Sequence, residues 1–330
     1  MTLEAAFLEA IRAAPDDLTS RLVYADWLEE QADSRGELIR IEEEMRQLPV
    51  FSDLYWQLKL RRNELRSRAA PDWLQTMRYG TDCQPTFRHG VPNGWKERWR
   101  LIREFTDRWH CRPLGDVGRR TEEIRAVEAR LGRTLPPSVR EWLAFAHDVR
   151  TSSGYFDVLR DVCTMKELEG WSAVSLLLQC EGDYHWAVRH ADFDLPDPPI
   201  HAFHWDFESR DETFVPHENN PIADTVTTFA LGYVMDYTNA EGGEFSTVVH
   251  EPTQLLHDLE IAFPVRSRFG TMEIFEAENI FIHLGSSSWT PHQQLTIMVA
   301  KPLPPEAIPA FLWDYTHNGD SCSGMFRPRR

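Results

Sequence analysis

The residue types best suited to metal chemistry gather in one acidic segment, HAFHWDFESRDETFVPHE, which contains His201, His204 and His217. Imidazole nitrogens and carboxylate oxygens are common zinc ligands, but a zinc site needs three or four of them converging on one point. His201 and His204 are three residues apart, so their side chains lie on opposite faces if this segment is a β-strand. The neighbouring ADFDLPDP lacks the glycine and the final glutamate of a calcium-binding loop. We therefore expect no metal site.

Residues that could act as nucleophiles occur without the neighbours that would activate them. The serines of SSGY and SSSWT do not lie in the G-x-S-x-G turn of an α/β-hydrolase, and no catalytic triad can be assembled from them. No G-x-x-x-x-G-K or G-x-G-x-x-G motif is present to hold a phosphate group or a dinucleotide. The sequence thus predicts a protein that is not an enzyme and has no cofactor. A hydrolase with an unrecognised site is the least favoured alternative.

Acidic residues are concentrated in one part of the chain. The formal net charge is −17, and residues 151–260 alone contain 21 acids and only 4 bases. A surface of one sign attracts the opposite sign and repels its own, so this region should avoid nucleic acid and could bind a basic protein. The alternative is a solvated face that only keeps the protein in solution.

The sequence carries no signal for a membrane or for export. No apolar run approaches the roughly 18 residues that span a bilayer, and the first residues, MTLEAAFLEAIRAAPDD, do not have the pattern of a signal peptide. The five cysteines form no C-x-x-C pair, which argues against a disulfide framework and against a cysteine zinc site. We expect a cytoplasmic protein without a membrane partner, and its oligomeric state stays open.

The elements that must position these side chains begin with helices. In LEAAFLEAIRAA the apolar residues recur at helical spacing, Thr2 can cap the start, and the following PDD ends this helix and caps the next. Further helices are predicted in DLTSRLVYADWLEEQAD, ELIRIEEEMRQL and YWQLKLRRNELRSRA. The Gly- and Pro-containing residues 79–94 are typical of a linker. Because one core rarely serves more than about 250–300 residues, we predict two domains, residues 1–78 and residues 95–330.

The segment RTEEIRAVEARLGRTLPPSVREWLAFAHDVR, residues 120–150, predicts two helices packed as a hairpin. Thr121 can cap the first helix, Gly132 suits the left-handed position after its end, and Pro136 or Pro137 fits the first turn of the second. Strands are predicted in VSLLLQC, YHWAVRH, PIHAFHW, NIFIHLG and QLTIMVAK, and a helix in TVTTFALGYVMDYTNA. Together these elements indicate an α+β fold, with a mixed sheet and packed helices that follow a small all-α domain.

The first 50 residues contain an ordered string, PDDLTSRLVYADWLEEQADSRGELIRIEEEM. This string resembles the bacterial repeat-companion domain, whose hallmark is a run close to RLVYADWLEE followed by a short break, RGE and another apolar helix. Such domains stand at the N-terminus of multidomain bacterial proteins and have no established catalytic role. The resemblance therefore implies that Asp26 and Trp27 serve as a helix-packing and capping pair.

Two motifs stand in order within residues 95–260. The first, E-x-x-L-G followed by L-P and an aromatic-Leu pair, consists of Glu128, Leu131, Gly132, Leu135, Pro136, Trp142 and Leu143. The second, a W-x-[IV] strand followed by an acidic stretch and D-P-P-[VI], consists of Trp186, Val188, Asp197, Pro198, Pro199 and Ile200. With these motifs the segment resembles the SUKH superfamily, which includes fungal Smi/Knr cell-wall regulators and many bacterial immunity proteins. The resemblance implies a SUKH-like sheet with packed helices, with a C-terminal extension from about Val265.

Bacterial members of this superfamily are thought to neutralise toxins delivered by neighbouring cells, and the resemblance implies such a role here. We hypothesise a protein-binding module whose acidic surface binds a basic, nuclease-like toxin and blocks its phosphate sites. The candidate partner-binding residues are Glu181, Asp183, Tyr184, Trp186, Asp192, Asp194 and Asp197. The alternative is an intracellular regulatory scaffold or adaptor, closer to the fungal use of the fold.

Overall fold

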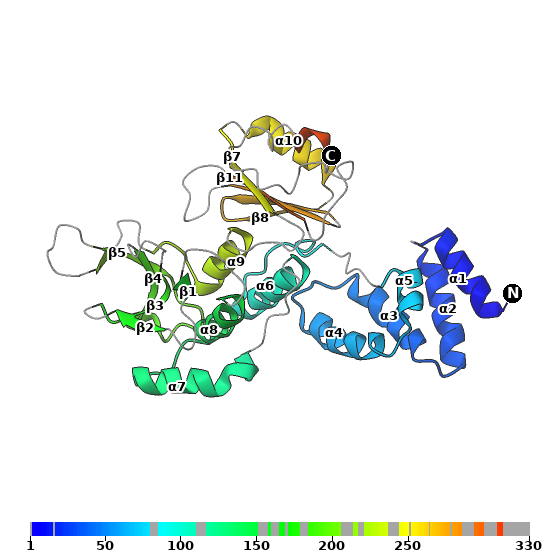
Figure 1. The fold of residues 1–330 in the computed structure, drawn as a ribbon, viewed down its shortest axis with the longest axis horizontal. Coiled ribbons are helices and arrows are strands. Elements are labelled where there is room, and N and C mark those ends of the chain that lie inside the picture. The colour runs from blue at the N-terminus through cyan, green and yellow to red at the C-terminus, as the bar shows by residue number, and fades with distance from the viewer. Residues whose placement is uncertain are drawn as a thin grey trace, which may run out of the picture. The chain divides into compact units, whose positions relative to one another are not determined.

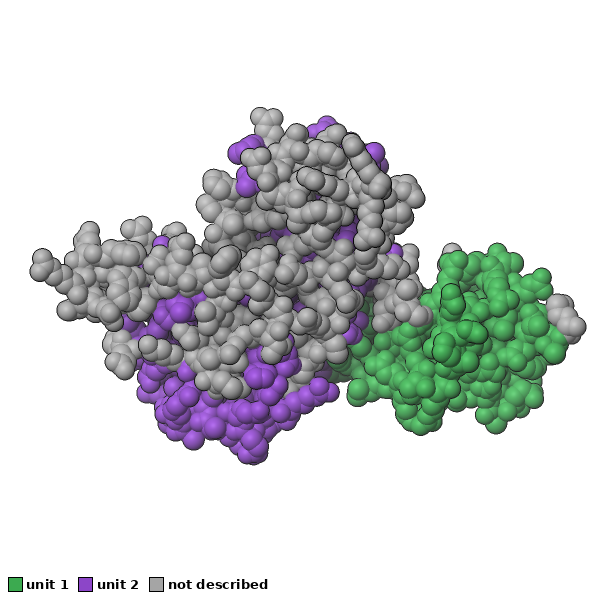
Figure 2. All heavy atoms as spheres, viewed as in Figure 1, with its two compact units in different colours: residues 1–89 green, residues 90–330 purple. Residues whose placement is uncertain are grey.

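The chain folds into two compact units, Met1–His89 and Gly90–Arg330 (Figures 1 and 2). The computed structural model describes residues 2–15, 17–79, 85–109, 117–150, 158–159, 165–168, 171–178, 184–205, 214–216, 221–236, 244–250, 252–263, 265–277, 279–285, 294–299 and 309–312. Unit 1 is helical and unit 2 combines helices with two sheets. The α+β class and the all-α N-terminal part are therefore confirmed, and the boundary between the units falls inside the segment 79–94 predicted as a linker.

Unit 1 is a small bundle of helices. Its elements are α1 (Leu3–Ala13), α2 (Leu18–Glu30), α3 (Arg35–Met45), α4 (Asp53–Arg66) and α5 (Pro71–Met77). The predicted caps are present, because the Thr2 hydroxyl accepts a hydrogen bond from the Ala5 amide, and the Asp17 carboxylate accepts hydrogen bonds from two amides of the first turn of α2. These bonds satisfy backbone donors that have no partner within the helix.

The buried face of α2 comes from the RLVYADWLEE string. Arg21, Tyr24, Ala25 and Leu28 are all buried, and the Tyr24 hydroxyl accepts a hydrogen bond of 3.1 Å from the Trp73 indole. Helix α3 approaches α2 closely at Gly36, where an added Cβ would lie 2.8 Å from the Ala25 carbonyl oxygen. The string therefore serves the packing of α2 against its neighbours.

Asp26 and Trp27 have different roles in this bundle. The Trp27 ring lies 5.7 Å from the Phe7 ring and 6.1 Å from the Tyr24 ring, as expected for a packing residue. Asp26 is exposed in the middle of α2 and forms an ion pair with Arg40 of α3. The expectation that Asp26 caps a helix is wrong, because capping requires a residue at the helix end and α2 extends four residues beyond it.

Unit 2 contains five α-helices among its described residues, with two short 3₁₀-helices. They are α6 (Trp95–Trp109), η1 (Val117–Arg120), α7 (Thr121–Leu131), α8 (Pro137–Arg150), η2 (His190–Asp192), α9 (Val226–Asp236) and α10 (Thr253–Ala262). The helix over 226–236 was predicted from TVTTFALGYVMDYTNA and is confirmed.

The predicted helix hairpin is formed by α7 and α8. Gly132 has a φ of 62° at the end of α7, and α8 begins at Pro137, as expected. Trp142 is fully buried, and its indole N–H donates to the Leu176 carbonyl oxygen at 3.2 Å, which ties α8 to a strand of the first sheet. The predicted Thr121 cap is wrong, because η1 leads directly into α7 and the Thr121 hydroxyl donates back to the carbonyl groups of Val117 and Gly118.

The first sheet contains three of the predicted strands. Its strands are β1 (Val158–Leu159), β2 (Lys166–Leu168), β3 (Ala173–Leu178), β4 (Tyr184–Arg189), β5 (His201–Trp205) and β6 (Phe214–Pro216). They run in the order β1-β3-β4-β5-β6, with β2 also paired to β3 (Figure 1). The segments VSLLLQC, YHWAVRH and PIHAFHW become β3, β4 and β5, and both His201 and His204 lie in β5.

A second, separate sheet follows. It consists of β7 (Glu244–Val248), β8 (Val265–Phe269), β9 (Met272–Glu276), β10 (Ile280–Gly285) and β11 (Gln294–Val299), in the order β7-β11-β10-β9-β8. The predicted single mixed sheet is therefore wrong: the described strands form two sheets, and every described strand pair is antiparallel. The physical reason is the short connections, such as the one between β8 and β9, because a parallel pair needs a crossover of about a dozen residues.

The second sheet is an integral part of unit 2. Strand β10 is buried on both faces, with the Phe281 ring 4.9 Å from the Phe105 ring of α6, and with Ile282 in a core cluster that includes Leu255 and Leu259 of α10. The His283 ring is 3.1 Å from the carbonyl oxygen of Met235, in α9. The chain after Val265, expected to be an extension, thus supplies four of the five strands of a sheet that packs against α6, α9 and α10.

Candidate protein-binding surface

The seven candidate partner-binding residues fall into three groups. Glu181 and Asp183 lie outside the described residues. Tyr184 and Trp186 lie on β4. Asp192, Asp194 and Asp197 lie in η2 or in the segment that connects it to β5.

The two aromatic candidates point to the helix-covered face of the first sheet. Successive side chains of a strand alternate between its faces, so Tyr184 and Trp186 share one face. The Trp186 ring lies 6.5 Å from the Phe229 ring of α9, and the Tyr184 ring lies 6.1 Å from the ring of His204, its partner across the sheet. Both side chains are half-buried. They therefore contribute to packing first and expose only part of their surface.

Asp197 holds the start of α9 in place. Its carboxylate accepts hydrogen bonds from the Thr227 amide at 3.1 Å and the Thr227 hydroxyl at 2.5 Å, at the start of α9. The adjacent backbone continues the connection, since the Pro196 carbonyl accepts from the Ser138 amide of α8 and the Pro198 carbonyl accepts from the Val226 amide. A carboxylate in this position satisfies free N–H groups and interacts favourably with the helix dipole. Asp197 is thus a structural residue.

Asp192 is also engaged with its own unit. Its carboxylate oxygen lies 3.3 Å from Nε2 of His201, which is buried on β5. This pair connects η2 to the face of the sheet opposite the helices. A partner that needed the Asp192 carboxylate would have to share it with the imidazole.

Of the three described candidate acids, Asp194 is the one whose carboxylate is accessible to a partner. It is exposed, and no hydrogen bond or ion pair joins its carboxylate to another described residue. The next side chain, Leu195, is 46% exposed. An exposed carboxylate beside an exposed apolar side chain can attract a partner by charge and then bind it by burial of apolar surface.

A second turn adds an aromatic side chain to this surface. The His190 amide donates a hydrogen bond of 2.7 Å to the Ser172 carbonyl, which joins residues 190–195 to residues 171–172. We call these two segments the paired turns. Trp171 is 37% exposed, and its ring lies 5.6 Å from the Phe203 ring, so the indole is supported on one side and open on another. Trp171 is not among the residues predicted from the sequence, although a tryptophan between turn residues and a strand is an available signal.

His190 is the first residue of the longer of the paired turns, and its side chain is buried. Its side chain is 8% exposed, and its Nε2 atom is 3.6 Å from the Glu167 carboxylate, too far for a hydrogen bond. Burial lowers the pKa of His190 below its usual 6.5; the nearby Glu167 carboxylate opposes this shift and Arg133 adds to it. The neutral imidazole is therefore the form that fits the folded protein.

A serine–histidine pair is also present on the first sheet. The Ser175 hydroxyl lies 2.7 Å from Nδ1 of His185, and it is also 3.2 Å from the Leu177 carbonyl, at the point where the β3–β4 register shifts. Ser175 is fully buried. A nucleophile must reach its substrate, so we assign this pair to the stabilisation of the irregular β3 backbone.

Other classes of site were sought in the part of the chain that the structure describes. There, no three side chains of His, Cys, Asp or Glu come together in a way that could hold a metal ion, and His217 lies outside that part. None of the described helices combines the length and the apolar character that crossing a membrane requires.

Comparison of this chain with protein-family models, with curated proteins and with solved structures found no significant match. The resemblances to the repeat-companion domain and to the SUKH superfamily stay predictions made from the sequence.

Proposed function

We propose that unit 2 is a non-enzymatic, SUKH-like protein-binding module, and that it acts as an immunity protein by binding a basic, nuclease-like toxin. The observation that carries this proposal is the paired turns, which expose Trp171, Asp194 and Leu195 on backbone held by a direct hydrogen bond. Of the residues predicted from the sequence, only Asp194 belongs to this set, and Asp192 and Asp197 have bonding partners inside the unit.

The three side chains have complementary roles in such an interface. Tryptophan is enriched among the residues that dominate binding energy, and a supported indole loses little conformational freedom when a partner covers it. Asp194 belongs to a region with 21 acids and 4 bases between residues 151 and 260. This charge raises the association rate of a basic partner, while burial of Trp171 and Leu195 slows its dissociation.

The test is capture of a basic protein from the source cell by the full chain, followed by kinetics with the captured protein. Asp194→Lys should slow association and weaken its dependence on salt, and Trp171→Ala should speed dissociation about tenfold or more. Glu122→Lys is the matched control, because it makes the same charge change at an exposed position on α7.

Three results would count against the proposal. Equal effects of Asp194→Lys and Glu122→Lys would show that only net charge matters. If Trp171→Ala bound the partner as tightly as the wild type, the paired turns would not be part of the interface. Capture that depends on unit 1 alone would favour the scaffold hypothesis instead.

A further inference from the structure

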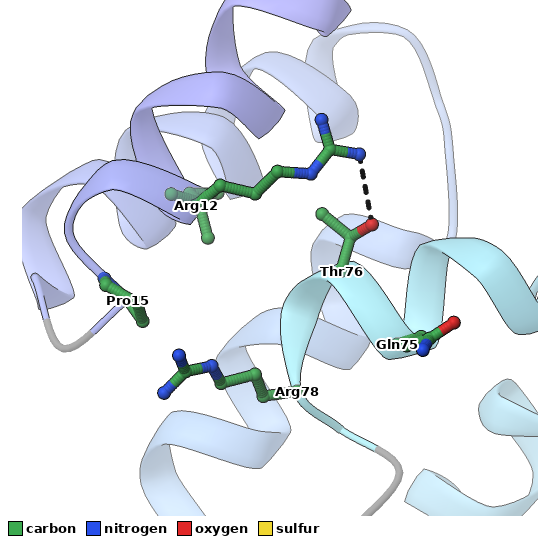
Figure 3. Close-up of a pocket in the computed structure, with 6 residues that line it drawn as sticks. Arg12, Pro15, Gln75, Thr76 and Arg78 are labelled. Carbon is green, nitrogen blue, oxygen red and sulfur yellow. Dashed lines mark hydrogen bonds between the residues drawn. The ribbon is translucent and has the colours of Figure 1, made fainter.

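A cavity of about 310 Å³ lies in unit 1 between the end of α1 and the end of α5. It is lined by Ile11, Arg12, Pro15, Gln75, Thr76 and Arg78. Figure 3 shows the Arg12 side chain reaching from α1 to the Thr76 hydroxyl, to which it donates a hydrogen bond of 3.2 Å. The Arg78 side chain extends from the end of α5 toward the chain at Pro15. Among the described residues, the lining thus holds two guanidinium groups and no acid.

The two arginines differ from most arginines of the same unit. Carboxylates pair with many of the others, and the paired set is Arg21, Arg35, Arg40, Arg46, Arg61, Arg66 and Arg68. Neither Arg12 nor Arg78 has a carboxylate partner among the described residues. Residues 1–80 contain 15 acids and 11 bases, so the local composition does not lack carboxylates. Two arginines without a carboxylate partner among the described residues therefore line one cavity.

Arg78 also has an unusual backbone conformation. Its φ of 57° places it in the left-handed region at the end of α5, a position that glycine ordinarily occupies. An arginine there costs stability relative to glycine, and residues held in this way are concentrated at functional sites. The same conformation lets the Arg78 and Tyr79 amides bond the carbonyl groups of Gln75 and Leu74. These bonds reduce the negative potential of the helix end near the cavity.

We propose that this cavity binds the phosphate group of a small molecule. Guanidinium groups that come from two different helices can each hold a different pair of oxygens, which suits a tetrahedral phosphoryl group better than a planar carboxylate. The Gln75 side-chain amide offers a further donor, whereas the Thr76 hydroxyl already donates to the Asp72 carbonyl and accepts from Arg12. The cavity volume exceeds that of a phosphate ion, and Ile11 and Pro15 supply an apolar wall for the rest of the molecule.

The experiment is calorimetric titration of the full chain with inorganic phosphate, and separately with acetate, at constant ionic strength. The wild-type chain should bind one phosphate saturably and acetate at least about tenfold more weakly. Arg12→Ala and Arg78→Gly should each lower phosphate affinity by about tenfold or more. Arg68→Ala, which removes the same charge from an exposed arginine two residues after the end of α4, should bind phosphate like the wild type.

Arg78→Gly carries an internal check on folding, because glycine fits the left-handed conformation without strain. In the absence of phosphate, amide hydrogen exchange of α1 and α5 in this variant should be as slow as in the wild type or slower. Loss of phosphate binding with that protection retained supports the site. Absence of saturable phosphate binding, equal binding of acetate, or an equal loss in Arg68→Ala would overturn it.

Discussion

The two segments with the strongest sequence motifs use their residues in different ways. In unit 1, the RLVYADWLEE string places Arg21, Tyr24, Ala25 and Leu28 in the interior, and Gly36 allows α3 to approach α2. In unit 2, the acidic segment 192–197 divides: Asp192 and Asp197 are bonded within the unit, and Asp194 is exposed. One motif therefore uses its buried residues to pack helices, and the other combines residues bonded within the unit with one that is open to a partner.

The difference follows from where each side chain finds its partner. Helix α2 turns one face toward its neighbours, so every third or fourth residue of the string is buried together. The acidic segment has no such period, and each of its carboxylates is placed by the elements that happen to lie beside it. The number of acidic residues in a segment thus exceeds the number of carboxylates that a partner can reach.

The largest expected effect tests the structural reading of unit 1. Gly36→Ala would place a methyl group 2.8 Å from the Ala25 carbonyl oxygen, a backbone atom that cannot rotate away. We expect a loss of about 1–3 kcal/mol in the free energy of unfolding of unit 1, measured by denaturant titration followed by far-UV circular dichroism. No measurable loss would mean that α2 and α3 are not in close contact.

The next largest effect compares two carboxylates of the acidic segment 192–197. Asp197→Ala removes the carboxylate that bonds the Thr227 amide and hydroxyl, and it should destabilise unit 2 by about 1–2 kcal/mol. Asp194→Ala is the matched control, and its unfolding free energy should stay within about 0.5 kcal/mol of the wild type because its side chain is exposed. Equal losses of unfolding free energy in the two variants would show that Asp197 does not stabilise unit 2 more than the exposed Asp194.

A smaller effect, of opposite sign, is expected at Gly232 in α9. A Cβ added there meets no atom of another described segment within 4 Å, in contrast to Gly36. Alanine loses less conformational entropy than glycine when a helix forms, so Gly232→Ala should stabilise unit 2 by about 0.5–1 kcal/mol. The same denaturant titration measures it. Destabilisation would indicate that the surroundings of α9 are more crowded than the structure shows.

The smallest effect concerns pH and the paired turns. The folded-state pKa of His190 lies below its usual 6.5, so the unfolded chain takes up the proton first as the pH falls. The stability that the neutral imidazole contributes is complete above about pH 6.5 and is lost as the pH falls through the folded-state pKa.

His190→Gln removes this titration. Unfolding free energies compared between about pH 7.5 and about pH 5.5 should fall less in the variant than in the wild type. Glu167 and Arg133, the charged neighbours of His190, are present in both proteins. An identical pH dependence would show that His190 is not buried as described.

Much of the local structure could be predicted from the sequence. The caps at Thr2 and Asp17, the left-handed Gly132, the start of α8 at Pro137 and the strands β3, β4 and β5 all agree with the prediction. These features depend on a side chain and the backbone within a few residues of it, or on a short repeat of apolar positions. The Thr121 cap failed for a local reason as well, since a 3₁₀ turn directly before α7 takes up its hydroxyl.

The candidate site was harder to predict, because its members are defined by contacts distant in the chain. Asp197 bonds Thr227, thirty residues away, and Trp186 packs against Phe229. Trp171 is brought to the site by one backbone hydrogen bond between Ser172 and His190. These contacts join residues that are distant in the chain, so no periodic pattern in the sequence indicates them.

By itself, the sequence determined the helical first unit, most element positions in the second, and the acidic character of residues 151–260. Periodicity, capping chemistry and composition are properties of neighbouring residues, so they can be read along the chain. Only the tertiary structure decided that the strands form two antiparallel sheets, that Asp197 holds α9 while Asp194 is open, and that Arg12 and Arg78 face one cavity. Each of these depends on which distant segments meet, and pairing between distant segments is set by packing of the whole fold.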